Sequence, residues 1–264
     1  MNTDKTANPM LKAVLFDLDN TLLDWSGFIR ETWETSEAKR LRRVMDYFHG
    51  EGATQTDEAT FLVEYQQRTH LAWQQAFVNL HAPNVGRVLV EAAAAAGVPS
   101  RLLNPRRCLE AYDWGAVDGT VIFPEVPEVL TILNEAGIRI GIVTNAYQPM
   151  WMRDIEIDAF GLLDFFPTCR ISAADVGYLK PHPEIFRAAL ECVGARPEET
   201  VFVGDDLEAD IAGSQAAGMH AVLRTAARQG NPNTGATPDG VIQSLHDLLL
   251  LLDTWFAGWR GETA

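Results

Sequence analysis

Two aspartates, Asp17 and Asp19, follow the apolar run that opens the segment "VLFDLDNTLLD" (residues 14–24). Residues two apart on an extended chain lie on one face about 7 Å apart, so both carboxylates can reach one small substrate. One can attack a phosphorus atom while the other, if its proton affinity is raised, protonates the departing oxygen. Because two nearby anions repel each other, this arrangement predicts a cation between them.

Further polar residues follow other apolar runs. They are Thr144 and Asn145 after residues 138–143, and Asp205, Asp206 and Asp210 after residues 200–204. Ligands of open parallel sheets bind beyond the carboxyl ends of the strands, so we expect these side chains near Asp17. Carboxylates at Asp17 and Asp205 suit magnesium (Mg2+), which prefers oxygen ligands. Thr144, and Lys180 in "GYLKPHPEIF" (177–186), are suitable hydrogen-bond donors to a phosphate group.

Short apolar runs and amphipathic segments alternate along the sequence. Strands are predicted at residues 11–16, 138–143, 167–172, 200–204 and 220–224. Helical patterns over 125–137, 182–194 and 206–218 separate most of them, and each pattern ends at a glycine that can supply a left-handed stop. Such alternation predicts right-handed crossovers and an α/β fold, a doubly wound parallel sheet of the Rossmann-like type.

The first crossover is far too long for a simple connection. Between Thr21 and about Phe123 no convincing strand is found, and three- and four-residue apolar spacing recurs. We therefore expect an inserted all-α cap domain, a small helical bundle. The predicted organisation is a sheet domain at 10–24 and 120–254, a helical cap domain at 25–119, and terminal tails at 1–9 and 255–264.

The C-terminal part combines a polar loop with an apolar helix. Residues 225–240 are rich in Gly, Asn, Pro and Thr and predict a surface loop, and residues 241–256 predict an amphipathic helix. Trp255, Phe256 and Trp259 lie among the last 10 of the 264 residues. We expect them to dock on the sheet domain rather than on a second subunit, because exposed apolar patches on monomers are usually small.

Composition limits the partners and the compartment. The chain is 47% apolar, enough for a sizeable core, and its formal charge of −15 disfavours non-specific binding to nucleic acid or to an anionic membrane. The sequence lacks an apolar run of membrane-spanning length and a signal-peptide pattern, so we expect a cytoplasmic protein, either a monomer or a homodimer. Cys108, Cys169 and Cys192 are predicted to be reduced packing residues.

Four segments carry a resemblance to a known family. "FDLDNTLLD", "IVTNA", "GYLKPHPEIF" and "VFVGDDLEADIAGSQAAG" occur in the order of the motifs of the haloacid dehalogenase-like (HAD) hydrolase superfamily. The sequence resembles this family over the whole predicted sheet domain, and the size of the insertion between the first two motifs also agrees. The resemblance implies a core domain with a helical cap and a reaction through a phosphorylated aspartate.

The resemblance also implies a role for individual residues. Asp17 would be the nucleophile and Asp19 the acid and base, while Thr144 and Lys180 would hold the phosphate group. Magnesium would be bound by Asp17, by the backbone carbonyl of Asp19 and by Asp205. Asp210 would lie beside the metal or orient Lys180, and Asp206 would either support the metal from outside its ligand shell or cap the helix that starts there. Trp25, Ser26 and Phe28 follow the first motif and are the expected contacts of the leaving group.

The reaction type follows from Asp19. Haloacid dehalogenases of the family lack an acid two residues after the nucleophile, so Asp19 favours the phosphatase and phosphomutase branches. A phosphonatase needs a cap lysine poised for a Schiff base, and nothing marks Lys39, which is the only lysine in the insertion, for that role. The sequence therefore predicts a magnesium-dependent phosphatase of a small phosphate ester. The alternatives are a phosphomutase with the same sheet-domain residues and a non-catalytic protein that binds phosphate or metal.

Overall fold

The structure, a computed structural model, describes residues 10–225 and 235–261, and within these ranges it contains a six-stranded parallel sheet in the order β5-β4-β1-β6-β7-β8. The strands are β1 (Ala13–Phe16), β4 (Arg139–Thr144), β5 (Cys169–Ser172), β6 (Thr200–Gly204), β7 (His220–Arg224) and β8 (Gly240–Ile242). From β1 the chain builds outward through β4 and β5, and then returns to the other side of β1. The predicted doubly wound α/β fold is confirmed, with its switch point at β1.

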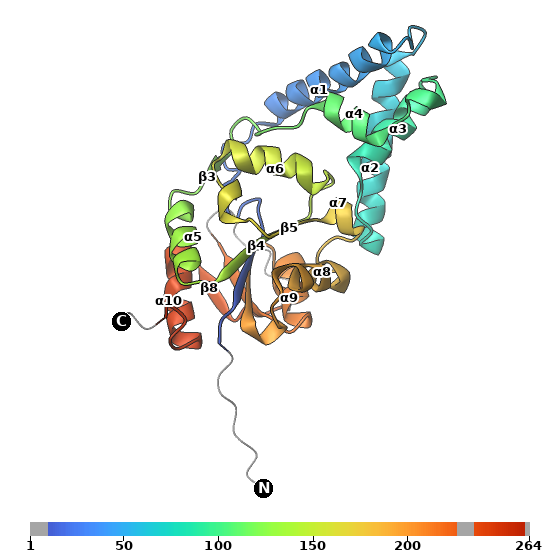
Figure 1. The fold of residues 1–264 in the computed structure, drawn as a ribbon. Helices are drawn as coiled ribbons and strands as arrows, with labels where there is room; N and C mark the ends of the chain where they lie inside the picture. Colours follow the sequence, from blue (N-terminus) through green and yellow to red (C-terminus); the bar gives the residue numbers. More distant parts are fainter. Residues whose placement is uncertain (1–9, 226–234, 262–264) are drawn as a thin grey trace.

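Both faces of the sheet are buried, which explains the continuous apolar runs in its strands. Val14 and Phe16 of β1 belong to the apolar cluster that also contains α5 (Val126–Glu135) and α10 (Leu245–Trp255). Ala13 and Leu15 face the opposite cluster. That cluster contains α8 (Pro183–Val193), and Figure 1 shows the helices on the two sides of the strands.

Other helices of this part connect the strands. They are α6 (Met150–Ala159), α7 (Ala173–Val176), a π-helical segment at Leu207–Ala212 that continues into α9 (Gly213–Ala216), and 3-10 turns at Leu163–Phe165 and Pro197–Glu199. The predicted glycine stops are confirmed, because Gly137, Gly194 and Gly218 have φ angles of 73°, 65° and 85°. Within the described residues, no helix combines the length and the apolar character needed to span a membrane.

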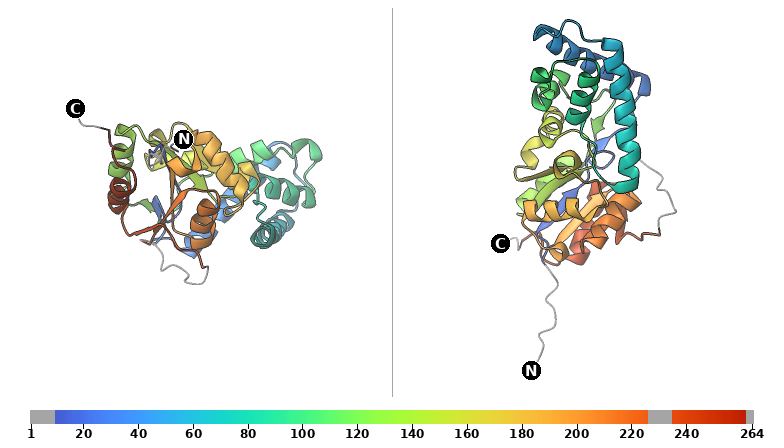
Figure 2. Two further views of the ribbon diagram at one scale, coloured as in Figure 1. Left: turned by 90° about the horizontal axis from the view of Figure 1, so that it is seen from below. Right: turned by 90° about the vertical axis from the view of Figure 1, so that its right-hand side faces the viewer.

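Helices fill the long first crossover. They are α1 (Arg30–Gly50), α2 (Glu58–Asn79), α3 (Val85–Ala95), a 3-10 turn at Ser100–Leu102, and α4 (Pro105–Tyr112), which the sequence did not predict. They share their own apolar cluster, to which α6 adds the buried Met152. Figures 1 and 2 place these helices beyond the carboxyl ends of the strands. The helices and their flanking connections, residues 25–119, are called the insertion below.

Two short strands that the sequence did not predict connect the insertion to the sheet. β2 (Leu23–Asp24) pairs with β3 (Val121–Ile122) in an antiparallel ribbon. The two connecting chains touch at Gly27 and Gly119, where a Cβ atom on Gly27 would lie 2.5 Å from the Gly119 carbonyl oxygen. Two-residue strands carry too little apolar periodicity to be recognised in a sequence.

The C-terminal segment differs from the prediction. Residues 240–242, where a predicted loop meets a predicted helix, form the edge strand β8. The helix α10 begins only at Leu245, because the Ser244 side chain caps it. Phe256 and Trp259 are buried in the sheet core, so this part of the predicted tail packs as the docking prediction requires. The predicted tail at 1–9, and parts of the loop at 225–240 and of the tail at 255–264, lie outside the described residues. Of the three cysteines, Cys192 is exposed, so the prediction that all three pack inside is wrong for it.

The close approach of the two connecting chains predicts an effect on stability. Gly119 has a φ angle of +85°, so Gly119→Ala adds left-handed strain to the contact with Gly27 and should lower the free energy of unfolding by at least about 1 kcal/mol. Gly115→Ala is the matched control, because a Cβ atom there meets nothing within 4 Å, and its effect should stay within about 0.5 kcal/mol. Urea unfolding of both variants measures the difference, and equal values would contradict the strain.

Candidate active site

The ammonium group of Lys180 lies at the centre of the predicted residues. Its Nζ atom lies 2.6 Å from Asp17 Oδ1 and 2.7 Å from Asp210 Oδ1, and it donates to the Val143 carbonyl oxygen at 2.8 Å. Only 3% of Lys180 is exposed. Asp17 follows β1, Val143 belongs to β4 and Asp210 follows β6, so this one cation joins the carboxyl ends of three neighbouring strands.

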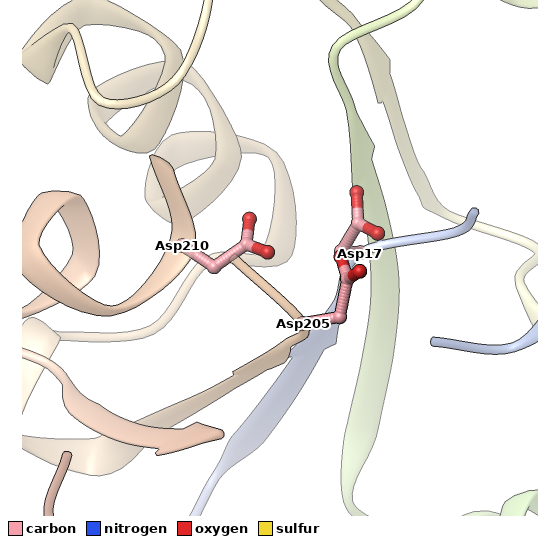
Figure 3. Close-up of side chains that lie close together, drawn as sticks. All are labelled: Asp17, Asp205 and Asp210. Carbon is pink, nitrogen blue, oxygen red and sulfur yellow. The ribbon is translucent and has the colours of Figure 1, made fainter. Parts of the chain in front are cut away.

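Three buried carboxylates face one another around this ammonium group. Asp17, Asp205 and Asp210 each offer an oxygen that lies within 4.8 Å of the other two, and Figure 3 shows the Asp210 carboxylate turned toward the Asp17 and Asp205 side chains. Burial raises the pKa of Asp17 well above its usual value; Lys180 opposes this rise, and Asp210 and Asp205 add to it. Three acids exceed the single charge of Lys180, and clustered oxygens of this kind suit a hard divalent cation.

The turn after β6 fixes two of these acids. A Cβ atom on Gly204 would overlap the Asp210 carboxyl group, so only glycine lets Asp210 fold back over the strand end. Asp210 Oδ2 accepts the Asp206 backbone N–H at 3.0 Å. The Asp206 side chain accepts hydrogen bonds from the backbone N–H groups of Glu208 and Ala209. Asp206 therefore caps the helix that starts there, which is one of its two predicted roles.

Asn145 and Thr144 end β4 in different surroundings. Asn145 Oδ1 accepts the Lys180 backbone N–H at 2.7 Å, and its Nδ2 donates to the Lys180 carbonyl oxygen at 3.1 Å. Asn145, predicted to bind substrate, therefore uses its amide to hold the backbone of Lys180. Thr144 is the last residue of β4 and is 1% exposed. Its strand, β4, is the neighbour of β1 in the sheet.

Asp19 lies in a second cluster of polar groups. Its Oδ1 atom accepts from Trp25 Nε1 at 2.9 Å and from Arg153 Nη2 at 2.7 Å. Arg153 Nη1 lies 3.2 Å from Glu156 Oε2, which also accepts from Trp114 Nε1 at 3.1 Å. Trp25, which was predicted to contact the leaving group, thus donates its indole N–H to Asp19.

Arg153 and Glu156 were not predicted from the sequence. Both occupy the buried face of α6, together with Met152 and Ile157. A charged pair at positions i and i+3 on the apolar face of a helix was the available signal, since buried charges need partners.

The two other predicted leaving-group residues lie at the start of the insertion. Ser26 is exposed, and its backbone N–H donates to Asp24 Oδ1 at 2.8 Å. The Phe28 ring packs against Trp25, with its centroid 5.5 Å from that of Trp25. Neither residue lines the crevice beside Lys180.

A crevice of about 330 Å³ opens beside Lys180. Asn145, Lys180 and Asp206 line it on the sheet side, and Trp73, Phe77 and Leu80 line it on the insertion side. Larger hollows of about 700 and 760 Å³ lie elsewhere and include none of these six residues. Trp73 and Phe77 were not predicted, because apolar periodicity does not identify which residues of a long helix face a neighbouring loop.

The raised pKa of Asp17 predicts a pH dependence of stability. Below its ordinary pKa Asp17 is protonated in both the folded and the unfolded chain, whereas above that value only the folded chain keeps the proton. In chelator, wild-type stability should therefore fall relative to Asp17→Asn as the pH rises above the ordinary pKa of an aspartate, by up to about 1.4 kcal/mol per pH unit. Glu208→Gln, which changes an exposed carboxyl group, is the control. A pH-independent difference between wild type and Asp17→Asn in urea unfolding would contradict the raised pKa.

Comparison with known proteins identifies the family. Residues 11–218 match a family model described as haloacid dehalogenase-like hydrolase. The chain is 30% identical over 248 residues to a phosphoglycolate phosphatase of Shigella dysenteriae serotype 1, covering 90% of this chain and 91% of that protein. It is 29% identical over 220 residues to a glyceraldehyde 3-phosphate phosphatase of Methanothermobacter thermautotrophicus, covering 81% and 85%. A 2-haloacid dehalogenase structure from Pseudomonas syringae pv. Tomato aligns with a TM-score of 0.62 at 25% identity, over 93% of this chain and 100% of that one. The chain belongs to the haloacid dehalogenase-like hydrolase family.

Proposed function

We propose that this protein is a magnesium-dependent phosphatase that hydrolyses a small phosphate ester through a phosphorylated Asp17. The observation that carries the proposal is the buried contact of Lys180 with Asp17 and Asp210, beside Asp205, at the carboxyl ends of β1 and β6. A nucleophilic carboxylate, a fixed ammonium group and a divalent-cation site are what phosphoryl transfer to an aspartate requires. The named phosphatases among the relatives support this choice.

Three groups would hold the metal: the carboxylates of Asp17 and Asp205 and the backbone carbonyl of Asp19. Oxygen donors alone form this set, which fits Mg2+ better than a softer metal. When bound, the ion supplies charge neutralisation for the phosphate group. Asp210 keeps Lys180 in place, and Thr144 and Lys180 donate to the phosphate oxygens.

Asp17 and Asp19 divide the covalent work. The Asp17 carboxylate attacks phosphorus, an O–P bond forms, and the P–O bond to the leaving group breaks as Asp19 gives that oxygen a proton. Asp19 then takes a proton from a water molecule, which attacks the phosphorylated Asp17 and releases inorganic phosphate. Both half-reactions use the same acid, so one carboxyl group two residues from the nucleophile is sufficient.

Asp19 also separates this proposal from dehalogenation. Displacement of a halide ion from carbon needs no proton for the leaving group, whereas an alkoxide leaving a phosphate ester does. Trp25 and Arg153 hold the Asp19 carboxyl group in a defined place, as expected of a proton donor. The similarity to a dehalogenase structure therefore supports a shared fold and not a shared substrate.

We also propose that the insertion acts as a cap over the site. The connector between α2 and α3 is hydrogen-bonded to the loop that carries Lys180: Leu179 N–H donates to the Leu80 carbonyl oxygen at 2.8 Å, and Ala82 N–H donates to the Gly177 carbonyl oxygen at 2.9 Å. The crevice between α2 and Lys180 would then receive the leaving group.

Phosphate release from a panel of phosphate esters tests the proposal. Turnover should require Mg2+ and disappear in chelator, and a folded Asp17→Asn variant should lose at least about 10³-fold in kcat. Equal turnover in Mg2+ and in chelator would contradict the metal site. Isomerised ester in place of free phosphate would identify a mutase. Activity retained by Asp17→Asn would rule out Asp17 as the nucleophile.

Phe77 gives a separate test of the crevice. It is 78% exposed, so Phe77→Ser should leave stability nearly unchanged while removing apolar contact with the leaving group. KM for an aryl phosphate should rise about tenfold, equivalent to about 1.4 kcal/mol of lost contact. The next residue, Val78, is 86% exposed and does not line the crevice, which makes Val78→Ser the matched control. Indistinguishable KM values for the two variants would place the leaving group elsewhere.

A further inference from the structure

We infer that Arg153, supported by Glu156, is a positioning residue that fixes the carboxyl group of Asp19 for proton transfer to the leaving group. The inference rests on the proposed phosphatase reaction and adds to it residues outside the four motifs.

The contacts on Asp19 are directional. Trp25 Nε1 and Arg153 Nη2 both donate to Oδ1, at 2.9 Å and 2.7 Å. Among the described residues no group donates to Oδ2. Two donors on one oxygen fix the plane of the carboxyl group and leave Oδ2 as the oxygen that carries the transferable proton.

The burial of the pair argues against a purely stabilising role. The side chains of Arg153 and Glu156 are 3% and 0% exposed. Within the described part of the chain, Arg153 Nε and Glu156 Oε1 have no hydrogen-bond partner. Removing two charges from water is costly, and apolar residues of similar volume are often at least as stable in such a place. A buried ion pair with two atoms that lack hydrogen-bond partners among the described residues is therefore better explained by its effect on the position of the Asp19 side chain.

The pair is also tied to both ends of the insertion. Trp25 begins the insertion and donates to Asp19, and Trp114, near its end, donates to Glu156 at 3.1 Å. The guanidinium carbon of Arg40, a residue of α1, lies 4.7 Å from the centroid of the Trp114 ring. Arg153 thus takes its orientation from Glu156, whose own position depends on packing within the insertion.

Leaving-group dependence separates positioning from a general structural role. The substrates are phenyl phosphates whose ring substituents vary the pKa of the departing phenol, assayed in Mg2+. Because 4-nitrophenol leaves readily without a proton, Arg153→Met should lower kcat/KM for 4-nitrophenyl phosphate by about tenfold or less, and for phenyl phosphate by about 10²-fold. The slope of log(kcat/KM) against phenol pKa therefore steepens. An unchanged slope, with all substrates slowed equally, would overturn the inference.

Four further variants complete the test. Arg170→Met removes the ion pair of Arg170 with Asp154, also on α6, and should leave the slope unchanged. Asp19→Asn should steepen the slope by itself, and adding Arg153→Met to it should change kcat/KM by less than about threefold. Arg153→Met/Glu156→Met removes both buried charges, so it should fold even where the single variant is unstable, and it should keep the steep slope.

The outcomes also separate this inference from the proposed function. A wild-type protein that releases no phosphate from any substituted phenyl phosphate would contradict the phosphatase proposal. An active wild type whose slope is unaffected by Arg153→Met would contradict only the positioning role. Independent, multiplying losses from Asp19→Asn and Arg153→Met would do the same.

Discussion

The buried ammonium group of Lys180 and the carboxylates around it depend on each other. An isolated lysine in this place would lose its hydration without compensation, and Asp17 and Asp210 without Lys180 would repel each other. The contact also requires the ends of β1, β4 and β6 to meet, because its partners come from all three strands or the turns that follow them. The strand order is therefore a chemical requirement as well as a packing solution. Asn145 also supports the position of Lys180, because its side chain is hydrogen-bonded to the Lys180 backbone.

The parts of the fold that were predictable are those in which local pattern and burial agree. Five strands were predictable because sheet faces covered on both sides demand continuous apolar runs, and glycine stops such as Gly137 mark the ends of the helices between them. β2, β3 and β8 were not predictable, because strands of two or three residues are too short to show an apolar periodicity. α4 was missed as well, although Asn104 caps it and Pro105 begins it.

The site divides in the same way. Asp17, Asp205 and Lys180 were predictable because their backbone positions, at strand ends or before a helix, place them with little dependence on packing elsewhere. The hydrogen bonds of Trp25 and Asn145 were not predictable, because their partners, Asp19 and the backbone of Lys180, are set by the tertiary structure. Arg153 and Phe77 were missed for a related reason: the faces that α6 and α2 present depend on how the insertion sits over the sheet.

A phosphate ester approaches a protein of formal charge −15, so long-range attraction contributes nothing to its capture. Affinity must come from short-range contacts, and the molecule offers them at two ends. In the proposed reaction, Lys180 and a cation on the acids beside it would bind the phosphate group, and the apolar wall formed by Trp73 and Phe77 would contact the rest of the substrate. The first set belongs to the sheet and the second to the insertion. Asp19 takes its contacts from both, through Arg153 on α6 and Trp25 at the start of the insertion. In the proposed reaction, proton transfer by Asp19 would therefore be the step in which the two parts act together.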